Sequence, residues 1–401
     1  MSRLSFFGDI AVSDVPLTVA ETLHDSKAFF ANLEGPYLGT YESRAILKSG
    51  PHLKQGSGFQ TLMKDPLFLS PWFFSEANNH FSDFGEEGKV ISRSLVLPHK
   101  SMRPFEVQLF DAEGNHLVDD SSAAFLAVLT TQEVFFGTEY FSDAFGNMES
   151  IPLRLSDLKS RGLKVVVFHH GGNELVPIPS PAEVARYRRW VEHGADAVIV
   201  THPHIPMPYE IFEGSPIVYG LGNFIVDGLK WQSVHHLALH SWKISFDMGS
   251  DLDFSISLLK QSSVGSGQNS EVIQASEHER NLLDAEHSYG MGIVEDQDFH
   301  AEVFRAIAHT AYLDFVPRQI GLTFVTDIAR KIGLLRNIRR IRSLRGGFAP
   351  HLYDLFASEA NRELYLTGFM EACGSPKNES KEARLVADRL LEIQPGFFER
   401  G

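Results

Sequence analysis

A chain of 401 residues with 43% hydrophobic and 22% charged residues has the composition of a soluble globular protein, and its length suggests two or so domains. The net charge of −15 argues against nucleic-acid binding, and the single cysteine, Cys373, excludes a disulfide framework or a cysteine-based zinc site. We find neither a transmembrane-length apolar run nor a secretory signal at the N-terminus, so we expect a cytoplasmic protein.

Two short strands near the N-terminus each end in polar side chains. Leu4 to Phe7 is followed by Gly8 and Asp9, and Phe29 to Ala31 runs into Asn32 and Glu34. Alternation along a strand places Asn32 and Glu34 on the same side. Taken singly, each segment is more typical of a turn or loop boundary than of a functional site.

A third apolar run ends in amide and imidazole groups. Leu67 to Glu76 is apolar and aromatic, and Asn78, Asn79 and His80 follow it. Such side chains are costly to bury unless they are hydrogen-bonded or bound to a metal. This segment is therefore another candidate for a site.

The central part of the chain reads as strand, helix, strand. The apolar run Val165 to Phe168 ends in His169 and His170, and the run Ala197 to Val200 ends before His202 and His204. Between them, residues 182–194 have the pattern of a helix. Ligands bind at the carboxyl ends of strands in open α/β sheets, so we expect these histidines to converge. Alternation along an extended backbone would let the rings of His202 and His204 face one way.

After Asp227 the pattern changes to rough alternation, which predicts antiparallel strands over 237–247 and 252–260. Residues 261–276 begin with a run rich in serine and glycine, and we expect a linker or long loop there. We predict a first domain over residues 1–260 and a mainly helical region over 277–401.

One segment of this helical region is basic. Residues 329–352 contain no acidic side chain but seven basic ones between Arg330 and Arg345, with apolar residues at helical spacing. Such a helix can contact an anionic membrane surface, an anionic polymer or a partner. The pattern favours a helix that packs on its own domain with a solvated basic face over such a contact.

Together, the strand ends supply carboxylate, amide and imidazole groups from five places in one chain. A two-metal hydrolytic centre needs such a set, because two neighbouring cations bind both an attacking water and the group that it attacks. This mixture of ligands suits Mn, Fe or Zn better than Ca. We therefore expect one or two divalent ions.

Several segments resemble the CapA-type capsule-synthesis proteins, which are associated with poly-γ-glutamate and other capsular polymers. The resemblance covers about residues 1–260 and rests on the segments ANLEGP (31–36), EANNHFSDFGEEG (76–88), HGGNE (170–174), GADAVIVTHPH (194–204) and VYGLGNFIVD (218–227). It implies a fold similar to that of calcineurin-like metallophosphatases, a four-layer α-β-β-α sandwich.

The resemblance also implies roles for individual residues. The matching metal ligands are Asp9, Glu34, Asn79, His170, His202 and His204. Glu34 stands where metallophosphatases have the carboxylate that bridges both metals, and His80 matches the histidine that protonates the leaving group. Gly222 and Asn223 match a Gly-Asn-Phe signature, read as a structural turn. Ala11 departs from the pattern, because metallophosphatases usually have a histidine there, and a single tightly held metal is an open alternative.

The resemblance implies a metal-dependent hydrolase in capsular polymer biosynthesis. It would act on a phosphoester or a γ-glutamyl amide through a metal-bound water. The alternative is a non-catalytic accessory factor that binds an anionic capsule polymer or a partner in a synthesis complex. Proteins of this type are often membrane-anchored or extracellular, which differs from the cytoplasmic location expected here.

Overall fold

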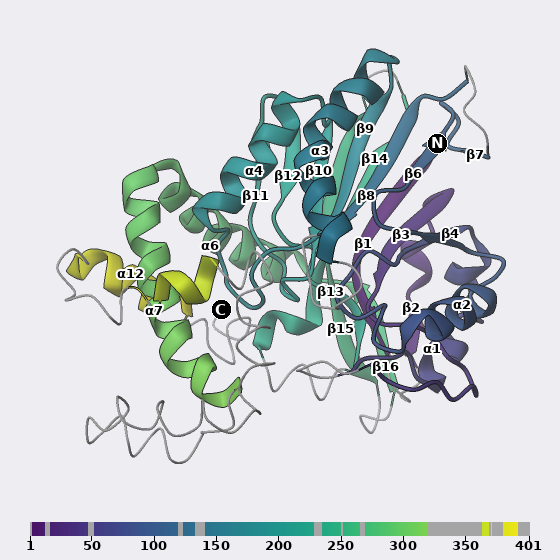
Figure 1. Cartoon of the computed structure of the whole chain (residues 1–401), viewed down its shortest axis with the longest axis horizontal. Coiled ribbons are helices and arrows are strands. Elements are labelled where there is room, and N and C mark those ends of the chain that lie inside the picture. Colours follow the sequence, from purple (N-terminus) through teal and green to yellow (C-terminus); the bar gives the residue numbers. More distant parts are fainter. Residues whose placement is uncertain are drawn as a thin grey trace.

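The protein is a mixed α/β structure with two β-sheets and a helical C-terminal region (Figure 1). It is described by a computed structural model over residues 2–12, 17–46, 52–118, 123–132, 141–227, 235–249, 252–264, 269–319, 363–368, 370 and 380–391. The basic segment 329–352 lies outside these residues. The predicted contact through Arg330 to Arg345 therefore stays a prediction.

The first sheet has nine strands among the described residues, and β1 lies near its middle. Its main path runs β2 (Leu17–Val19), β16 (Asn269–Gln274), β15 (Phe254–Val264), β14 (His240–Asp247), β1 (Arg3–Ala11), β3 (Ala28–Leu33), β4 (Trp72–Ser75) and β5 (Lys100–Met102). A further strand, β13 (Asn223–Val226), pairs with the end of β1. Strand β1 is parallel to β3 and β13, so their carboxyl ends meet at one edge.

The second sheet has seven strands within the described part of the chain. Their order is β11 (Tyr209–Phe212), β12 (Ser215–Val218), β10 (Ala197–Thr201), β9 (Lys164–His170), β8 (Leu126–Gln132), β6 (Val107–Phe110) and β7 (His116–Leu117). Strands β8, β9, β10 and β12 are parallel, and Thr201 pairs with His170. The predicted strand–helix–strand unit is confirmed, with α4 (Pro181–Glu192) between β9 and β10.

Successive side chains of β1 point into two different hydrophobic clusters, one on each face of the first sheet. Phe6 is fully buried and its ring lies 5.6 Å from that of Phe168 in the second sheet. Phe7 points the other way, and its ring lies 5.6 Å from that of Trp72 on the opposite face of the first sheet. The inner faces of the two sheets therefore share one hydrophobic core, because large side chains from both are removed from water together.

Helices and short 3-10 turns cover the outer surfaces. Helices α3 (Phe141–Ser160) and α4 contact the second sheet (Figure 1). The other elements before the C-terminal region are η1 (Glu21–Leu23), α1 (Ser57–Leu62), η2 (Pro66–Leu69), α2 (Gly85–Leu95) and η3 (His236–Leu239). Buried Phe59, Leu62 and Phe68 from α1 and η2 join the outer core of the first sheet.

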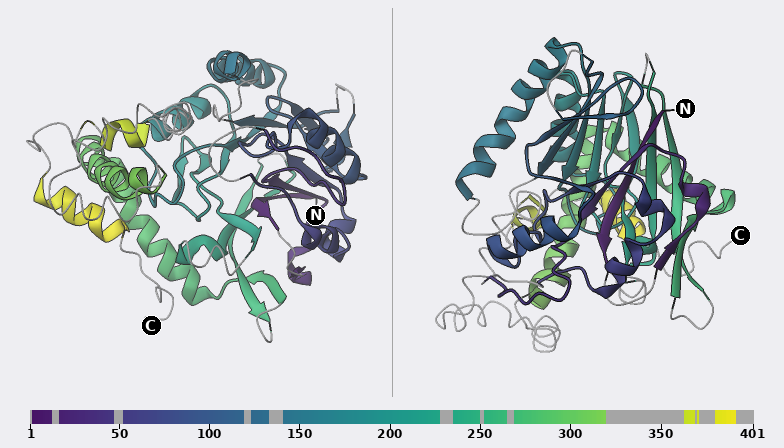
Figure 2. Two further views of the ribbon diagram at one scale, coloured as in Figure 1. Left: turned by 60° about the horizontal axis from the view of Figure 1, so that its bottom comes forward. Right: turned by 90° about the vertical axis from the view of Figure 1, so that its right-hand side faces the viewer.

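The C-terminal helices form a third hydrophobic cluster at one side of the molecule (Figure 1, Figure 2). They are α6 (Glu277–Glu295), α7 (Gln297–Gln319), a helical stretch at 363–368 and α12 (Lys381–Leu391). Val176 and Ile178, from the loop after β9, are buried in this cluster. No helix among the described residues is both long and apolar enough to span a bilayer.

The expected linker at 261–276 is wrong in its local structure, because it contains the end of β15 and all of β16. Gln261 lies in the segment predicted to be a loop, yet its side-chain amide forms hydrogen bonds with the backbone of β13. Its Oε1 accepts from the Val226 N–H at 3.0 Å, and its Nε2 donates to the Val226 carbonyl at 2.8 Å. Val272 is buried in the outer core. The domain boundaries themselves stay a prediction.

Candidate metal centre

Two carboxylates meet at the carboxyl edge of the first sheet. Asp9 lies within β1, Glu34 follows β3, and both side chains are fully buried. Asn32 Nδ2 donates to Asp9 Oδ1 at 2.7 Å and to Glu34 Oε2 at 2.5 Å. The expected placement of Asn32 and Glu34 on one side of the strand is therefore confirmed.

Glycine is required where β1 approaches the turn before β13. The Asp9 N–H donates to the Gly222 carbonyl at 3.1 Å. A Cβ at Gly8 would lie 1.7 Å from the same carbonyl oxygen. Gly222 itself has φ +79°, a conformation that suits glycine. This contact fixes the position of the Asp9 backbone relative to the turn before β13.

His170 ends β9 and faces the two carboxylates. Its Nε2 lies 3.8 Å from Glu34 Oε2 and 3.0 Å from Asn79 Oδ1, and its Nδ1 lies 3.0 Å from Thr201 Oγ1. His169 faces the other side of the sheet, where its ring packs against Tyr187 and Trp190. The choice of His170 over its neighbour as a site residue agrees with this placement.

His202 and His204 lie in the turn after β10, and the expectation of an extended backbone there is wrong. Their φ angles are +100° and +61°, in the left-handed region that non-glycine residues rarely adopt. Such residues cost of the order of 1–3 kcal/mol each and persist where surrounding contacts hold them. One such contact is the His202 N–H, which donates to Asp9 Oδ2 at 3.3 Å.

Asn223 sets the orientation of His204. Its Oδ1 accepts from His204 Nδ1 at 2.9 Å, and its Nδ2 donates to the Ala238 carbonyl at 3.0 Å. Because Asn223 Oδ1 can only accept, Nδ1 carries a proton, and Nε2 is the nitrogen of His204 that can bind a metal once its own proton is displaced. The Gly-Asn-Phe signature thus contributes to the site itself as well as to the turn behind it.

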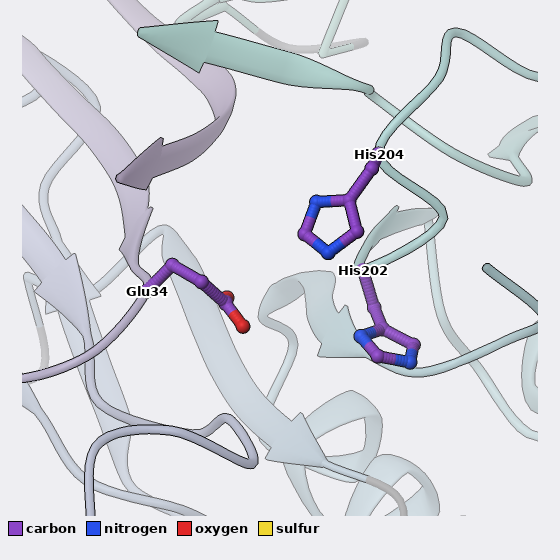
Figure 3. Close-up of side chains that lie close together, drawn as sticks. All are labelled: Glu34, His202 and His204. Carbon is purple, nitrogen blue, oxygen red and sulfur yellow. The ribbon is translucent and has the colours of Figure 1, made fainter. Parts of the chain in front are cut away.

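These side chains form two groups whose ligand atoms lie within 4.8 Å of one another. One contains Asp9, Glu34 and His170, and the other contains Glu34, His202 and His204 (Figure 3). Glu34 belongs to both. Its Oε1 is buried and has no hydrogen-bond partner among the described residues. Nor does any described lysine or arginine form an ion pair with Asp9 or Glu34. The donor set therefore fits divalent cations, which would neutralise buried carboxylates.

Burial and neighbouring charges shift the pKa values in these groups. Burial raises the pKa of the Glu34 carboxyl to about 8, and the charge of Asp9 adds to this effect. Burial lowers the pKa of both His170 and His202 well below the usual value, with a further contribution from the neighbouring histidines. Neutral imidazoles of this kind keep a lone pair for a metal.

His204 shifts in the opposite direction. Burial alone would lower its pKa, but the hydrogen bond to Asp9 and the charge of Asp9 outweigh it, so that the pKa is about 9. Without a metal, His204 is therefore the cation that partly balances the carboxylates. A metal would take over this role and displace its proton.

His80 lies at the edge of the two groups. Its Nε2 is 3.8 Å from Glu34 Oε1, and its Nδ1 is 2.8 Å from Asp83 Oδ2. The same Asp83 oxygen accepts from the Leu53 N–H at 2.8 Å. A buried carboxylate thus orients the imidazole that the resemblance assigns to proton transfer.

Known proteins match this chain over part of its length. A family model described as "Bacterial capsule synthesis protein PGA_cap" matches residues 115–228. The "PGA biosynthesis protein CapA" of Bacillus subtilis (strain 168) is 26% identical over 192 residues, which is 44% of this chain and 47% of that protein. The "Capsule biosynthesis protein CapA" of Bacillus anthracis is 26% identical over 170 residues, which is 38% of this chain and 39% of that protein.

The resemblance to the CapA-type proteins is confirmed. Each alignment spans less than half the length of the CapA protein that it matches. The family model includes His170, His202 and His204 but begins after Asp9, Glu34 and His80. The roles carried over to all of the site residues stay predictions, and the structure brings Asp9, Glu34 and His80 beside the histidines.

The sequence pattern assigns no role to three supporting residues. Asn32 links the carboxylates, Asp83 orients His80, and Thr201 contacts His170. Only Asn32 gave a signal, through its alternation with Glu34. Ala11 is the residue that departs from the metallophosphatase pattern. It ends β1 and pairs with Val226, and its methyl group cannot bind a metal.

Proposed function

We propose that this CapA-type protein is a metal-dependent hydrolase that acts in capsular polymer biosynthesis. The observation that supports this most directly is the position of Glu34, a buried carboxylate common to both groups of ligands. A shared carboxylate suits two cations held close together. The proposed ligands are Asp9, Glu34, Asn79, His170, His202 and His204, and the proposed ions are one or two of Mn, Fe or Zn.

We also propose that the two sheets form the four-layer α-β-β-α sandwich of metallophosphatases. Three observations support this arrangement. The inner faces share one core, α3 and α4 contact the second sheet, and α1 with η2 joins the outer core of the first sheet. In this arrangement ligands from both sheets meet at the edge where the parallel strands end.

The chemistry divides between the metal and the chain. When bound, the metal would polarise the scissile bond and lower the pKa of a water molecule. The chain's own part is to hold the ligands in place and to supply a proton. His80, oriented by Asp83, is the proposed general acid that protonates the leaving group. The proposed substrates are a phosphoester or a γ-glutamyl amide of a capsule polymer.

The proposal is tested by metal analysis and turnover together. Purified protein and the variants Asp9→Asn, His204→Ala and His80→Ala are analysed for bound transition metals. They are then assayed with a chromogenic phosphodiester and a γ-glutamyl anilide. We expect the first two variants to lose metal. We expect His80→Ala to keep metal and lose turnover by about 10²–10⁴-fold. Unchanged turnover in His80→Ala would remove it from the mechanism.

The second candidate function is a non-catalytic accessory factor. It is favoured by the names of the two relatives, which describe biosynthesis and no hydrolysis. This protein would use the same site to bind an anionic polymer or a synthesis partner. Capsule formation that survives His80→Ala but is lost when the basic residues from Arg336 to Arg345 are neutralised would favour it over the hydrolase.

A further inference from the structure

Glu174 lies at the rim of the metal centre but belongs to neither group of ligands. Its Oε1 is 3.5 Å from His202 Nε2. The Glu174 side chain is 49% exposed, whereas that of His202 is 1% exposed. The other ring nitrogen of His202, Nδ1, is buried, and the His202 side chain lies close to Glu34 and His204 (Figure 3).

The backbone holds Glu174 in register with the histidine turn. The Leu175 N–H donates to the Pro203 carbonyl at 2.9 Å, and the Gly171 N–H donates to the Thr201 carbonyl at 3.0 Å. The loop that carries Glu174 is thus bonded on both sides of it to the segment that carries His202. This pairing does not depend on the Glu174 side chain, so a substitution there leaves the loop in place.

The C-terminal helical region also contacts the loop that carries Glu174. His300 on α7 has its Nε2 2.8 Å from the Pro179 carbonyl, and Glu363 accepts from Ser180 Oγ at 2.6 Å. Ile178 is fully buried in the C-terminal hydrophobic cluster. The helical region therefore limits how far the rim can move away from the histidines.

We propose that Glu174 is a positioning residue, which accepts a hydrogen bond from the Nε2–H of His202 and so presents the Nδ1 lone pair of that ring to the metal. Histidine ligands usually donate their second N–H to a carboxylate or carbonyl, which fixes the tautomer and the ring orientation. The 3.5 Å separation is a few tenths of an ångström longer than a usual hydrogen bond, so the proposal requires the half-exposed Glu174 side chain to move closer to His202. The inference rests on the proposed metal centre.

The test measures metal affinity directly. Metal-free wild type, Glu174→Ala, Glu174→Gln and a control, Glu192→Gln, are titrated with Mn²⁺ and with Zn²⁺ by calorimetry. Glu192 is an exposed glutamate at the end of α4. We expect Glu174→Ala to bind about 10–100-fold more weakly than wild type. Glu174→Gln should recover part of this loss, because its amide oxygen can accept the same hydrogen bond. The control should match wild type.

A second measurement separates positioning from direct ligation. The Co²⁺-loaded proteins are compared by visible absorption at saturating metal. A positioning role leaves the ligand number and the band pattern of Glu174→Ala as in wild type, whereas loss of a direct ligand changes them and overturns the proposal. Equal melting temperatures of the metal-free proteins show that the variant folds.

The outcomes distinguish failure of the positioning role of Glu174 from failure of the proposed metal centre. If wild type binds metal and Glu174→Ala binds it equally well, the positioning role is wrong and the metal centre stands. If wild type binds no metal, the proposed function fails and this inference fails with it.

Discussion

Replacing Glu34 by glutamine should stabilise the metal-free protein while removing its response to metal. The carboxyl has a pKa of 4.5 in the unfolded chain and about 8 in the folded protein. Because the folded pKa is raised, stability is full below pH 4.5 and is lost as the pH rises towards 8. One pKa unit corresponds to about 1.4 kcal/mol, so the raised pKa of Glu34 makes the folded state about 3 kcal/mol less stable at pH 7 than below pH 4.5. Glutamine is uncharged and can still accept the hydrogen bond from Asn32.

The assay is urea unfolding of wild type and Glu34→Gln between about pH 5 and pH 8, with a chelator and with excess Mn²⁺. With the chelator, the stability advantage of the variant should grow with pH. With metal at about 100 times its dissociation constant, wild type should gain about 2.7 kcal/mol and the variant much less. A metal-free variant that is no more stable than wild type at pH 8 would refute the reasoning about buried charge. An equal gain from metal would refute the shared role of Glu34.

Three further predictions concern other parts of the molecule. Gly8→Ala would place a Cβ 1.7 Å from a backbone oxygen, so thermal unfolding should show a large loss of stability, whereas Gly249→Ala, with no atom within 4 Å, should change little. Asp83→Asn should lower turnover while leaving the metal content unchanged, because it removes the carboxylate that orients the proposed general acid; equal loss of metal would show a structural role instead. At Glu279, burial acts to raise the pKa, but the hydrogen bonds from Lys260 and Ser276 and the charge of Lys260 together outweigh it and lower the pKa to about 2. Glu279→Gln should therefore cost about 1 kcal/mol at neutral pH, and the difference from wild type should shrink as the pH falls from 4.5 towards 2; a difference independent of pH would contradict this.

The ends of the strands can be predicted from the sequence because a buried strand is an apolar run that stops where the polar side chains begin. Val165 to Phe168 is an unbroken apolar run, as expected of a strand covered on both faces, and its abrupt change to histidine marks the sheet edge. The parallel pairing of β9 with β10 then brings their carboxyl ends together. Local pattern plus one topological rule is therefore enough to place His170 near His202.

The remaining details depend on contacts between distant segments, which no local pattern encodes. The left-handed backbone of His202 and His204 is held by partners such as Asp9 and Asn223. The orientation of His80 depends on Asp83, which in turn is fixed by the backbone of Leu53. The serine and glycine content of the β15–β16 hairpin is typical of loops and predicts a linker, whereas its strand pairing depends on the three-dimensional structure.

The proposed ligands are distributed over both sheets and over residues 9–204 of the chain. Asp9 and the His202 backbone that it contacts are 193 positions apart, and Asn79 and His170 are 91 apart. These residues meet only where the two sheets pack together, because Asp9 and Glu34 belong to the first sheet and the histidines end or follow strands of the second. The centre would thus be assembled only after each sheet has formed and the two have docked. A cation bound there would link the first sheet to the second. The amount of metal that the protein retains would therefore measure how much of it has both sheets docked.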